Sequence, residues 1–198
     1  MKKLTLYFLL LFFSINSISQ NGRNGPSLWE EIRTNSKLDY DNTKPQIIEA
    51  LKKYDSHQYL INRLSKNGQR YLFYTVQEAL KRDLPVELSL IPFVESQFDP
   101  YAQSSTGASG IWQFIPSTAL ENGLKKNWWY DARRDIVAST NAAYNFLVKL
   151  NEEHDDWLIA IAAYNAGPSR VRKEIRKNKE KGLPTDFWSL NLPKETRA

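Results

Sequence analysis

The chain of 198 residues is long enough for one domain with a sizeable hydrophobic core, and it requires no second domain. Hydrophobic residues make up 41% and charged residues 25% of the sequence, as in globular proteins, and no cysteine is present to form a disulfide or to carry a lipid. The net charge of +5 favours anionic polymers, but it is too small to indicate nucleic acid as a partner.

Residues 1–19 have the anatomy of a secretory signal peptide. Two lysines precede an apolar run over residues 4–13, and small residues at 17–19 offer a cleavage site. The run is too short to cross a bilayer comfortably, so export and removal are favoured over an uncleaved membrane anchor. Residues 20–27 are polar and predict a linker. We therefore expect an exported protein of the periplasm or cell envelope, with no stable membrane insertion after signal removal.

Residues 28–82 predict an N-terminal helical scaffold. Ser27 is a suitable N-cap for a short helix over 28–33. From Pro45 to Leu64 apolar side chains recur at three- and four-residue spacing, which predicts a second helix, and the same pattern from Leu72 to Leu80 predicts a third. These helices lead into the segment that carries the candidate chemistry.

Residues 84–113 place the acidic side chain of Glu95 inside a densely apolar segment, in which Glu87 suits the positive start of a helix. Pro85 suits the first turn of a helix, Pro92 should kink or restart that helix, and Asp99-Pro100 should end it, which leaves Glu95 near the last turn. Apolar neighbours and the negative helix end both disfavour the ionised form, so we expect a raised pKa for Glu95. A carboxyl group that keeps its proton suits cleavage of a glycosidic bond. The alternative is a buried glutamate satisfied by hydrogen bonds or by an arginine.

The loop over residues 101–110 consists of small and hydroxyl-bearing side chains with two glycines. Such a loop lets a ligand approach the backbone closely and offers hydroxyl groups to a polyol. A mobile linker is the alternative, but the loop runs straight into the apolar segment 111–115, which predicts core.

Four further helical segments are predicted after this loop. A short helix begins at Pro116 and ends at Gly123, and a longer one runs from Asp135 to Leu150. The alanine-rich segment 157–165 follows Asp156 as N-cap and is stopped by Gly167 and Pro168. Tyr164 and Asn165 then lie at its C-terminal end, where they could line a cleft; the alternative is a plain C-cap by Asn165. The basic run over 170–181 is read as a solvated helix face.

Between these helices, residues 125–130 (KKNWWY) combine two lysines with three aromatic side chains. Packing of Trp128 or Trp129 into the core is favoured over stacking on a sugar or contact with an anionic polymer. Arg133 and Arg134 are expected to neutralise buried acids or to cap helix ends, which is a structural role.

These motifs resemble those of lytic transglycosylases with the soluble-lytic-transglycosylase (SLT) fold, relatives of goose-type lysozyme. The resemblance rests on Glu95-Ser96, Phe98, Pro100, Ala102, Ser104, Gly107-Ala108, Gly110-Ile111-Trp112-Gln113 and Ala162-Ala163-Tyr164-Asn165-Ala166-Gly167. The segments LPVEL, ESQFDP, GIWQ, YDARRD, PTDFWSL and LPKET are similar to one membrane-bound branch of that family. The resemblance runs from about residue 28 to the last residue. It implies a mainly α, lysozyme-like catalytic domain over 83–198, without the family's following helix and wall-binding repeats.

The resemblance also implies a non-hydrolytic mechanism with a single acid. Glu95 would protonate the leaving oxygen of the MurNAc-GlcNAc β-1,4 bond in peptidoglycan. It would then act as base toward the sugar's own 6-hydroxyl, which closes a 1,6-anhydro ring, and the N-acetyl group of MurNAc would assist. Ser104, Gln113, Tyr164 and Asn165 would position the glycan and its N-acetyl group, with Thr106 at a more variable place. No metal or cofactor is implied, the partner is the glycan strand, and a monomer is expected.

Two other functions remain open at this point. A goose-type muramidase would hydrolyse the same bond with water, and glycosidases of that kind normally need a second carboxylate. Asp99 follows Glu95 closely, but Pro100 favours a turn or capping role for it. A peptidoglycan-binding module without turnover is the second alternative. Metal catalysis is poorly supported, because His57 and His154 stand in polar contexts without ligand spacing.

Overall fold

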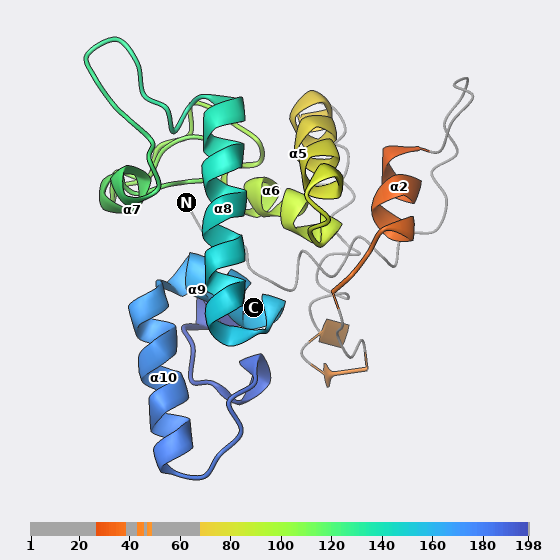
Figure 1. Ribbon diagram of the computed structural model, residues 1–198, viewed down its shortest axis with the longest axis vertical. Helices are drawn as coiled ribbons and strands as arrows, with labels where there is room; N and C mark the ends of the chain where they lie inside the picture. Colours follow the sequence, from red (N-terminus) through yellow and green to blue (C-terminus); the bar gives the residue numbers. More distant parts are fainter. Residues whose placement is uncertain (1–26, 39–42, 46, 49–67, 198) are drawn as a thin grey trace.

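A computed structural model describes residues 27–38, 43–45, 47–48 and 68–197 of the protein. In these residues the chain is mainly helical, with isolated β-bridges and no strand, which confirms the predicted fold class. The elements are α2 (Leu28–Thr34), α5 (Gln69–Lys81), η3 (Val86–Leu90), α6 (Ile91–Ser96), α7 (Pro116–Glu121), α8 (Ile136–His154), α9 (Trp157–Ala166), α10 (Pro168–Glu180), η4 (Phe187–Ser189) and α11 (Lys194–Arg197) (Figure 1). The predicted signal peptide, residues 20–26 of the predicted linker and most of the predicted second helix lie outside the described residues.

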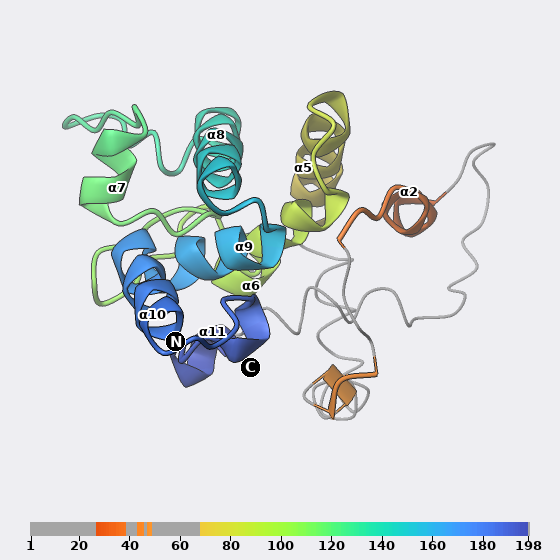
Figure 2. The same cartoon turned by 60° about the horizontal axis from the view of Figure 1, so that its bottom comes forward.

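Helix α9 is the centre of the fold. It contacts α8, α10, α11 and η4, and Figure 2 shows it lying between α8 and α10, with α6 alongside. Its six residues from Leu158 to Ala163 are all buried, and the alanines among them allow neighbouring helices to approach closely. As predicted, Asp156 caps its start by accepting the N–H groups of Leu158 (2.8 Å) and Ile159 (3.1 Å), and Gly167 ends it at φ +92°.

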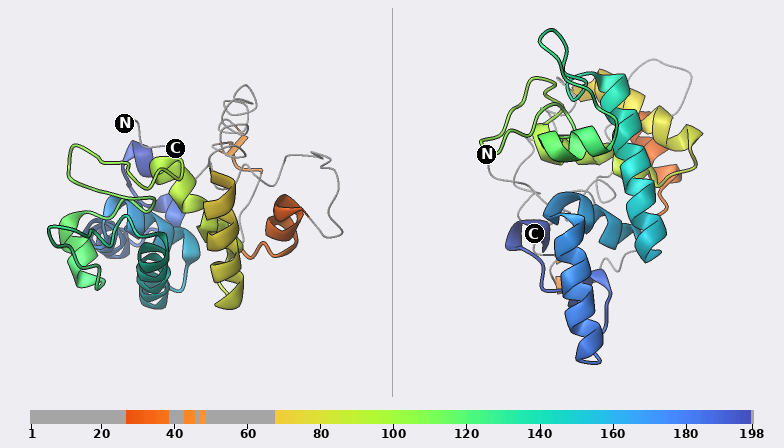
Figure 3. Two further views of the ribbon diagram at one scale, coloured as in Figure 1. Left: turned by 90° about the horizontal axis from the view of Figure 1, so that it is seen from above. Right: turned by 60° about the vertical axis from the view of Figure 1, so that its left-hand side comes forward.

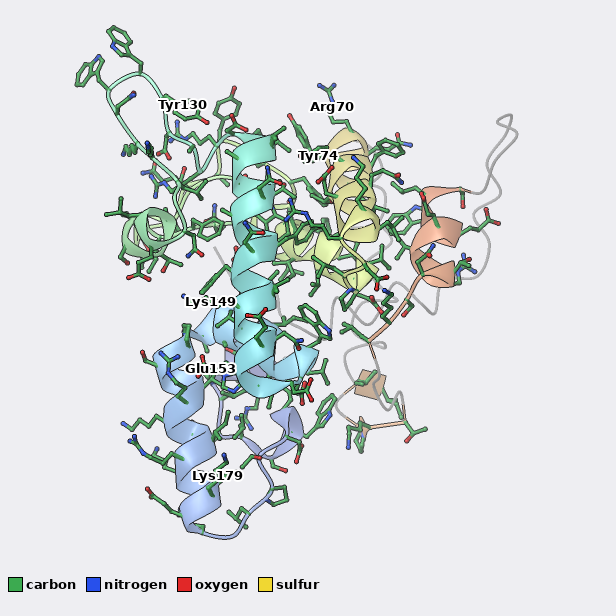
Figure 4. All side chains as sticks on the ribbon, viewed as in Figure 1. Arg70, Tyr74, Tyr130, Lys149, Glu153 and Lys179 are labelled. Carbon is green, nitrogen blue, oxygen red and sulfur yellow. The ribbon has the colours of Figure 1, made fainter. Side chains whose placement is uncertain are left out.

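Helix α8 packs on α9 and is longer than the sequence predicts. Asp135 caps its N-terminus by accepting the N–H of Ala138 at 2.9 Å. The helix continues past Leu150 to His154 and ends where Asp155 takes a left-handed conformation, so the predicted end was wrong. Residues 151–154 include two glutamates, which favour helix. Glu153, labelled in Figure 4, forms an ion pair with Arg172 of α10 at 2.9 Å.

The segment that carries Glu95 folds as two short helices, which agrees with the predicted restart at Pro92. The 3-10 helix η3 leads directly into α6, with Pro92 in the first turn of α6, where a missing N–H breaks no helical hydrogen bond. Residues 84–93 are all buried, as predicted. Helix α5 packs against η3, and Figure 3 shows α5 between α6 and α2.

Helix α2 joins the same hydrophobic core from the N-terminal side. Its Ser27 and Glu30 form the reciprocal hydrogen bonds of a capping box, which confirms the predicted start. Ile32 is 1% exposed and belongs to the core that also contains Leu72 and Val76 of α5. This hydrophobic core includes residues on both sides of the proposed domain boundary between residues 82 and 83. That boundary stays a prediction.

The aromatic segment after α7 corrects one prediction. Trp128 and Trp129 are 88% and 90% exposed, so neither packs into the core. Asn127 fixes the turn, since its side-chain oxygen accepts the N–H groups of Trp129 (2.9 Å) and Tyr130 (2.8 Å). The Tyr130 hydroxyl returns to the start of α8, where it donates to Asp135 at 2.9 Å (Figure 4).

Candidate active site

Glu95 lies in the last turn of α6, as predicted, and its side chain is partly buried. The helix ends earlier than expected, because Gln97 and Phe98 both adopt positive φ angles (+56° and +58°) and reverse the chain. Asp99 therefore lies outside the helix. It is exposed, and its carboxylate accepts the N–H of Tyr101 at 2.9 Å, which confirms the predicted turn role.

Ser96, next to Glu95, attaches the following loop to α6. Its buried hydroxyl lies 2.9 Å from the carbonyl oxygen of Ile111 and 3.0 Å from that of Pro92. The first carbonyl belongs to the loop and the second to the helix itself. This contact holds the far end of the loop beside the turn that carries Glu95.

The two hydroxyl groups predicted to bind sugar near the start of the loop form a hydrogen bond with each other. The Ser104 and Thr106 hydroxyl oxygens are 2.9 Å apart, and Ser104 Oγ also accepts the N–H of Ala108 at 3.0 Å. Ser104 is partly buried and Thr106 is exposed. Both side chains therefore shape the turn, and their contact with a glycan stays a prediction.

Gly110 allows a close backbone approach, but by the protein's own chain. At φ +81°, a Cβ added here would lie 1.8 Å from the carbonyl oxygen of Arg133. Arg133 is 4% exposed and donates to the carbonyl oxygens of Gly107 (2.8 Å) and Phe114 (3.2 Å). Its hydrogen bonds to Asp131 hold the pKa of that carboxyl below its usual value. The predicted structural role of Arg133 is confirmed, with loop carbonyls as its partners.

Gln113 closes the loop on itself. Its backbone is left-handed (φ +51°), and its side-chain amide donates to the carbonyl oxygens of Gly110 (2.8 Å) and Ala102 (3.2 Å). The amide hydrogens are thus used within the loop, so a glycan-binding role for Gln113 stays a prediction that falls on its carbonyl oxygen.

Tyr164 connects α9 to this loop. Its hydroxyl donates to the carbonyl oxygen of Trp112 at 2.8 Å, and its ring makes edge contacts with Trp112 and Phe114 at centroid distances of 6.4 and 6.0 Å. Burial raises the pKa of Tyr164 well above its usual value, and the nearby charge of Glu95 raises it further. The phenol therefore stays neutral beside Glu95.

Asn165 reaches Glu95 directly. Its Nδ2 lies 3.4 Å from Oε1 of Glu95, while its Oδ1 accepts a hydrogen bond from the Thr196 hydroxyl at 2.9 Å. The alternative of a plain C-cap by Asn165 is wrong, because its side chain is engaged by these two partners and α9 ends at Gly167. Thr196 was missed from the sequence, although it lies in the LPKET segment that marked the resemblance.

The geometry thus assembles one partly buried carboxyl group with an amide and a phenol from α9. Glu95, Tyr164 and Asn165 come together, and Gln113 lies in the loop whose neighbouring carbonyl at Trp112 binds Tyr164. This arrangement suits proton transfer by a single acid. Within the described part of the chain, no three histidine, cysteine or acidic side chains gather where they could hold a metal ion. The raised pKa of Glu95 stays a prediction.

Comparison with known proteins agrees with the motifs. Residues 74–186, more than half of the chain, match the family described as Transglycosylase SLT domain. Over 153 residues the chain is 48% identical to membrane-bound lytic murein transglycosylase D of Escherichia coli (strain K12), which covers 77% of this chain and 34% of that protein. The predicted resemblance is confirmed, together with its lysozyme-like helical class.

Two further relatives extend this similarity. A protein of Alteromonas sp. (strain M-1), named for tributyltin chloride resistance, is 44% identical over 124 residues, or 62% of this chain and 60% of that one. Membrane-bound lytic murein transglycosylase F of Desulfosudis oleivorans (strain DSM 6200 / JCM 39069 / Hxd3) is 32% identical over 108 residues, 51% of this chain and 22% of that one. The chain spans about a third of the length of its Escherichia coli relative.

Proposed function

Because the chain belongs to the transglycosylase SLT domain family, we propose that it is a peptidoglycan lytic transglycosylase. Its reaction would cleave the MurNAc-GlcNAc β-1,4 bond without water and leave 1,6-anhydroMurNAc ends. Relatives named lytic murein transglycosylases support this substrate. The observation that carries the proposal is the contact between Asn165 and Glu95, which joins two motifs distant in sequence at one carboxyl group.

In the first step Glu95 acts as general acid. Its proton passes to the glycosidic oxygen, the bond from that oxygen to C1 of MurNAc breaks, and the N-acetyl oxygen assists at C1. Asn165 supports this step, because its amide donates to Oε1 and can orient the carboxyl group. The position of Glu95 at the C-terminal end of α6 favours the protonated form.

In the second step the same carboxylate acts as general base. It takes the proton from the 6-hydroxyl of MurNAc while that oxygen bonds to C1, so the proton count of Glu95 returns to its starting value. One carboxylate therefore serves both steps, and the exposed Asp99 is not required.

The loop over residues 101–110, together with residues 111–113 that follow it, would form one wall of the glycan site. Ser104, Thr106 and Gln113 would bind sugar hydroxyl or N-acetyl groups through the atoms that the loop leaves available, and Tyr164 and Asn165 would border the acid. The buried Ser96 supports this, because it attaches the loop to the turn that carries Glu95.

Mass analysis of the products from purified peptidoglycan tests the proposal. We expect soluble fragments with anhydro ends and no new reducing sugar. New reducing ends would instead identify a goose-type muramidase. Pelleting with insoluble peptidoglycan without release of fragments would identify a binding module.

We place this activity in the cell envelope, where peptidoglycan lies. The expected export signal supports that location, and two relatives are named membrane-bound. Among the described helices, none has the length and apolar character needed to span a bilayer. A fusion to a reporter that is active only after export would report whether residues 1–19 direct the chain out of the cytoplasm.

A further inference from the structure

The hydroxyl of Thr196 is buried against the site. Thr196 lies in α11 and is 1% exposed, and its Oγ1 donates to Oδ1 of Asn165 at 2.9 Å. Most buried hydroxyls in proteins have a hydrogen-bond partner, and here the partner is the Asn165 carboxamide. The third motif and the C-terminal segment therefore meet at one amide.

The segment that carries Thr196 is itself anchored to the domain. Asn178 of α10 donates to the carbonyl oxygens of Pro184 (2.8 Å) and Ser189 (2.9 Å), and Leu190 and Leu192 are each 2% exposed. Helix α11 then contacts α9. Thr196 is thus held at a fixed place relative to Asn165, as a group that orients another side chain must be.

The two ends of a carboxamide are not equivalent. With Oδ1 bonded to Thr196, the Nδ2 end of Asn165 faces Oε1 of Glu95 at 3.4 Å. If the amide turned over, two acceptors would face each other unless Glu95 placed its proton on Oε1. That proton would then be donated to Asn165 and not to the sugar.

We infer that Thr196 is a positioning residue, whose hydroxyl holds the carboxamide of Asn165 in place so that its Nδ2 lies beside Glu95. This inference rests on the proposed function, in which Glu95 is the acid. Thr196 touches neither substrate nor reacting atoms, and it acts through Asn165. The distance of 3.4 Å is expected to shorten when a glycan is bound, as catalytic hydrogen bonds often do.

The test compares Thr196→Val, which keeps the shape and removes the hydroxyl, with Thr196→Ser, which keeps the hydroxyl. On soluble glycan strands we expect Thr196→Val to lower kcat about tenfold with little change in KM, and Thr196→Ser to restore most of it. Thr75→Val is the matched control, because Thr75 is equally buried in α5 and bonds to backbone carbonyls. We expect that variant to lose stability but not turnover per folded molecule.

A double variant decides whether Thr196 acts through Asn165. If it does, Thr196→Val should cost nothing further in an Asn165→Ala background, since the amide to be oriented is gone. The same tenfold loss in both backgrounds would overturn the inference. So would an equal loss in Thr196→Ser.

A measurement without substrate separates this inference from the proposed function. Hydrogen exchange of the Asn165 side-chain amide, followed by NMR, should be slow in the wild type and in Thr196→Ser and faster in Thr196→Val. Absence of cleavage by the wild type would refute the proposed function. Unchanged exchange in Thr196→Val would refute the positioning role, whatever the activity.

Discussion

Glu87 and Glu95 belong to the same apolar segment, yet their surroundings differ. Glu87 is 0% exposed, and its Oε1 accepts hydrogen bonds from the Ser36 hydroxyl and from the N–H groups of Lys37 (3.0 Å) and Leu38 (2.9 Å). Glu95 is partly buried, and Asn165 lies 3.4 Å from its Oε1. Donors from residues 36–38 thus enclose the carboxyl group of Glu87, whereas Glu95 stays partly exposed beside Asn165.

The two glutamates also lie at different places in the fold. The three donors to Glu87 follow α2 directly, so this glutamate attaches the N-terminal scaffold to η3. Glu95 stands where α6 ends and where the loop and α9 meet. Burial alone therefore does not distinguish the glutamate that we propose as the acid from the one that joins the scaffold, whereas their places in the fold do.

Substitution of Glu95 should produce the largest effect. Glu95→Gln keeps the size of the side chain and removes the transferable proton, so release of soluble fragments from peptidoglycan should fall at least about a thousandfold. Its Tm should stay close to that of the wild type, because Glu95 is not fully buried. A large drop in Tm would instead make Glu95 a structural residue like Glu87.

Substitution of Glu87 should affect stability. In the wild type the N–H groups of Lys37 and Leu38 donate to the carboxyl group of Glu87. Glu87→Gln replaces one of its oxygens by an NH2 group, which cannot accept, so the free energy of unfolding should fall by about 2–4 kcal/mol. Denaturant titration measures this change. The exposed Glu121→Gln serves as control and should lie within about 0.5 kcal/mol of the wild type.

Asp131 is a third carboxylate to compare with Glu87 and Glu95, and it forms an ion pair with Arg133. Since Arg133 lowers its folded pKa, its contribution is present above the unfolded value of 3.8 and is lost as pH falls through the lower folded value. Asp131→Asn should cost about 1 kcal/mol at neutral pH and progressively less below pH 3.8. Unfolding curves at a series of pH values check this, and a gap that widens in acid would contradict it.

Removal of one donor from Glu87 should give the smallest effect. Ser36→Ala leaves the two backbone N–H groups in place, so we expect a loss of about 1 kcal/mol or less. Thermal unfolding would show it. A loss as large as that of Glu87→Gln would mean that Ser36 alone holds this carboxylate.

Local patterns in the sequence predicted much of the helical framework. Asp156 with Gly167 bounded α9, and Pro92 marked the restart of the helix that carries Glu95, because caps and prolines act on neighbouring residues. The end of that helix was expected at Asp99-Pro100, but Gln97 and Phe98 end it earlier. Three motifs also placed Tyr164 and Asn165 near Glu95, through a family resemblance and not through periodicity.

Contacts between distant segments could not be predicted in this way. Nothing local in the sequence shows that Ser36 meets Glu87 or that Thr196 meets Asn165, because tertiary packing creates both contacts. The prediction that Trp128 or Trp129 packs into the core was wrong for a related reason. Its apolar surface predicts burial, but the Asn127 turn fixes a hairpin that carries it away from the core.

Turnover per folded molecule in Glu95→Gln and Glu87→Gln, measured side by side on purified peptidoglycan, tests the central claim most directly. The temperature should be one at which both variants are folded. The account predicts background activity for Glu95→Gln and nearly wild-type activity for Glu87→Gln. Cleavage by Glu95→Gln at the wild-type rate, or an equal loss in both variants, would contradict it.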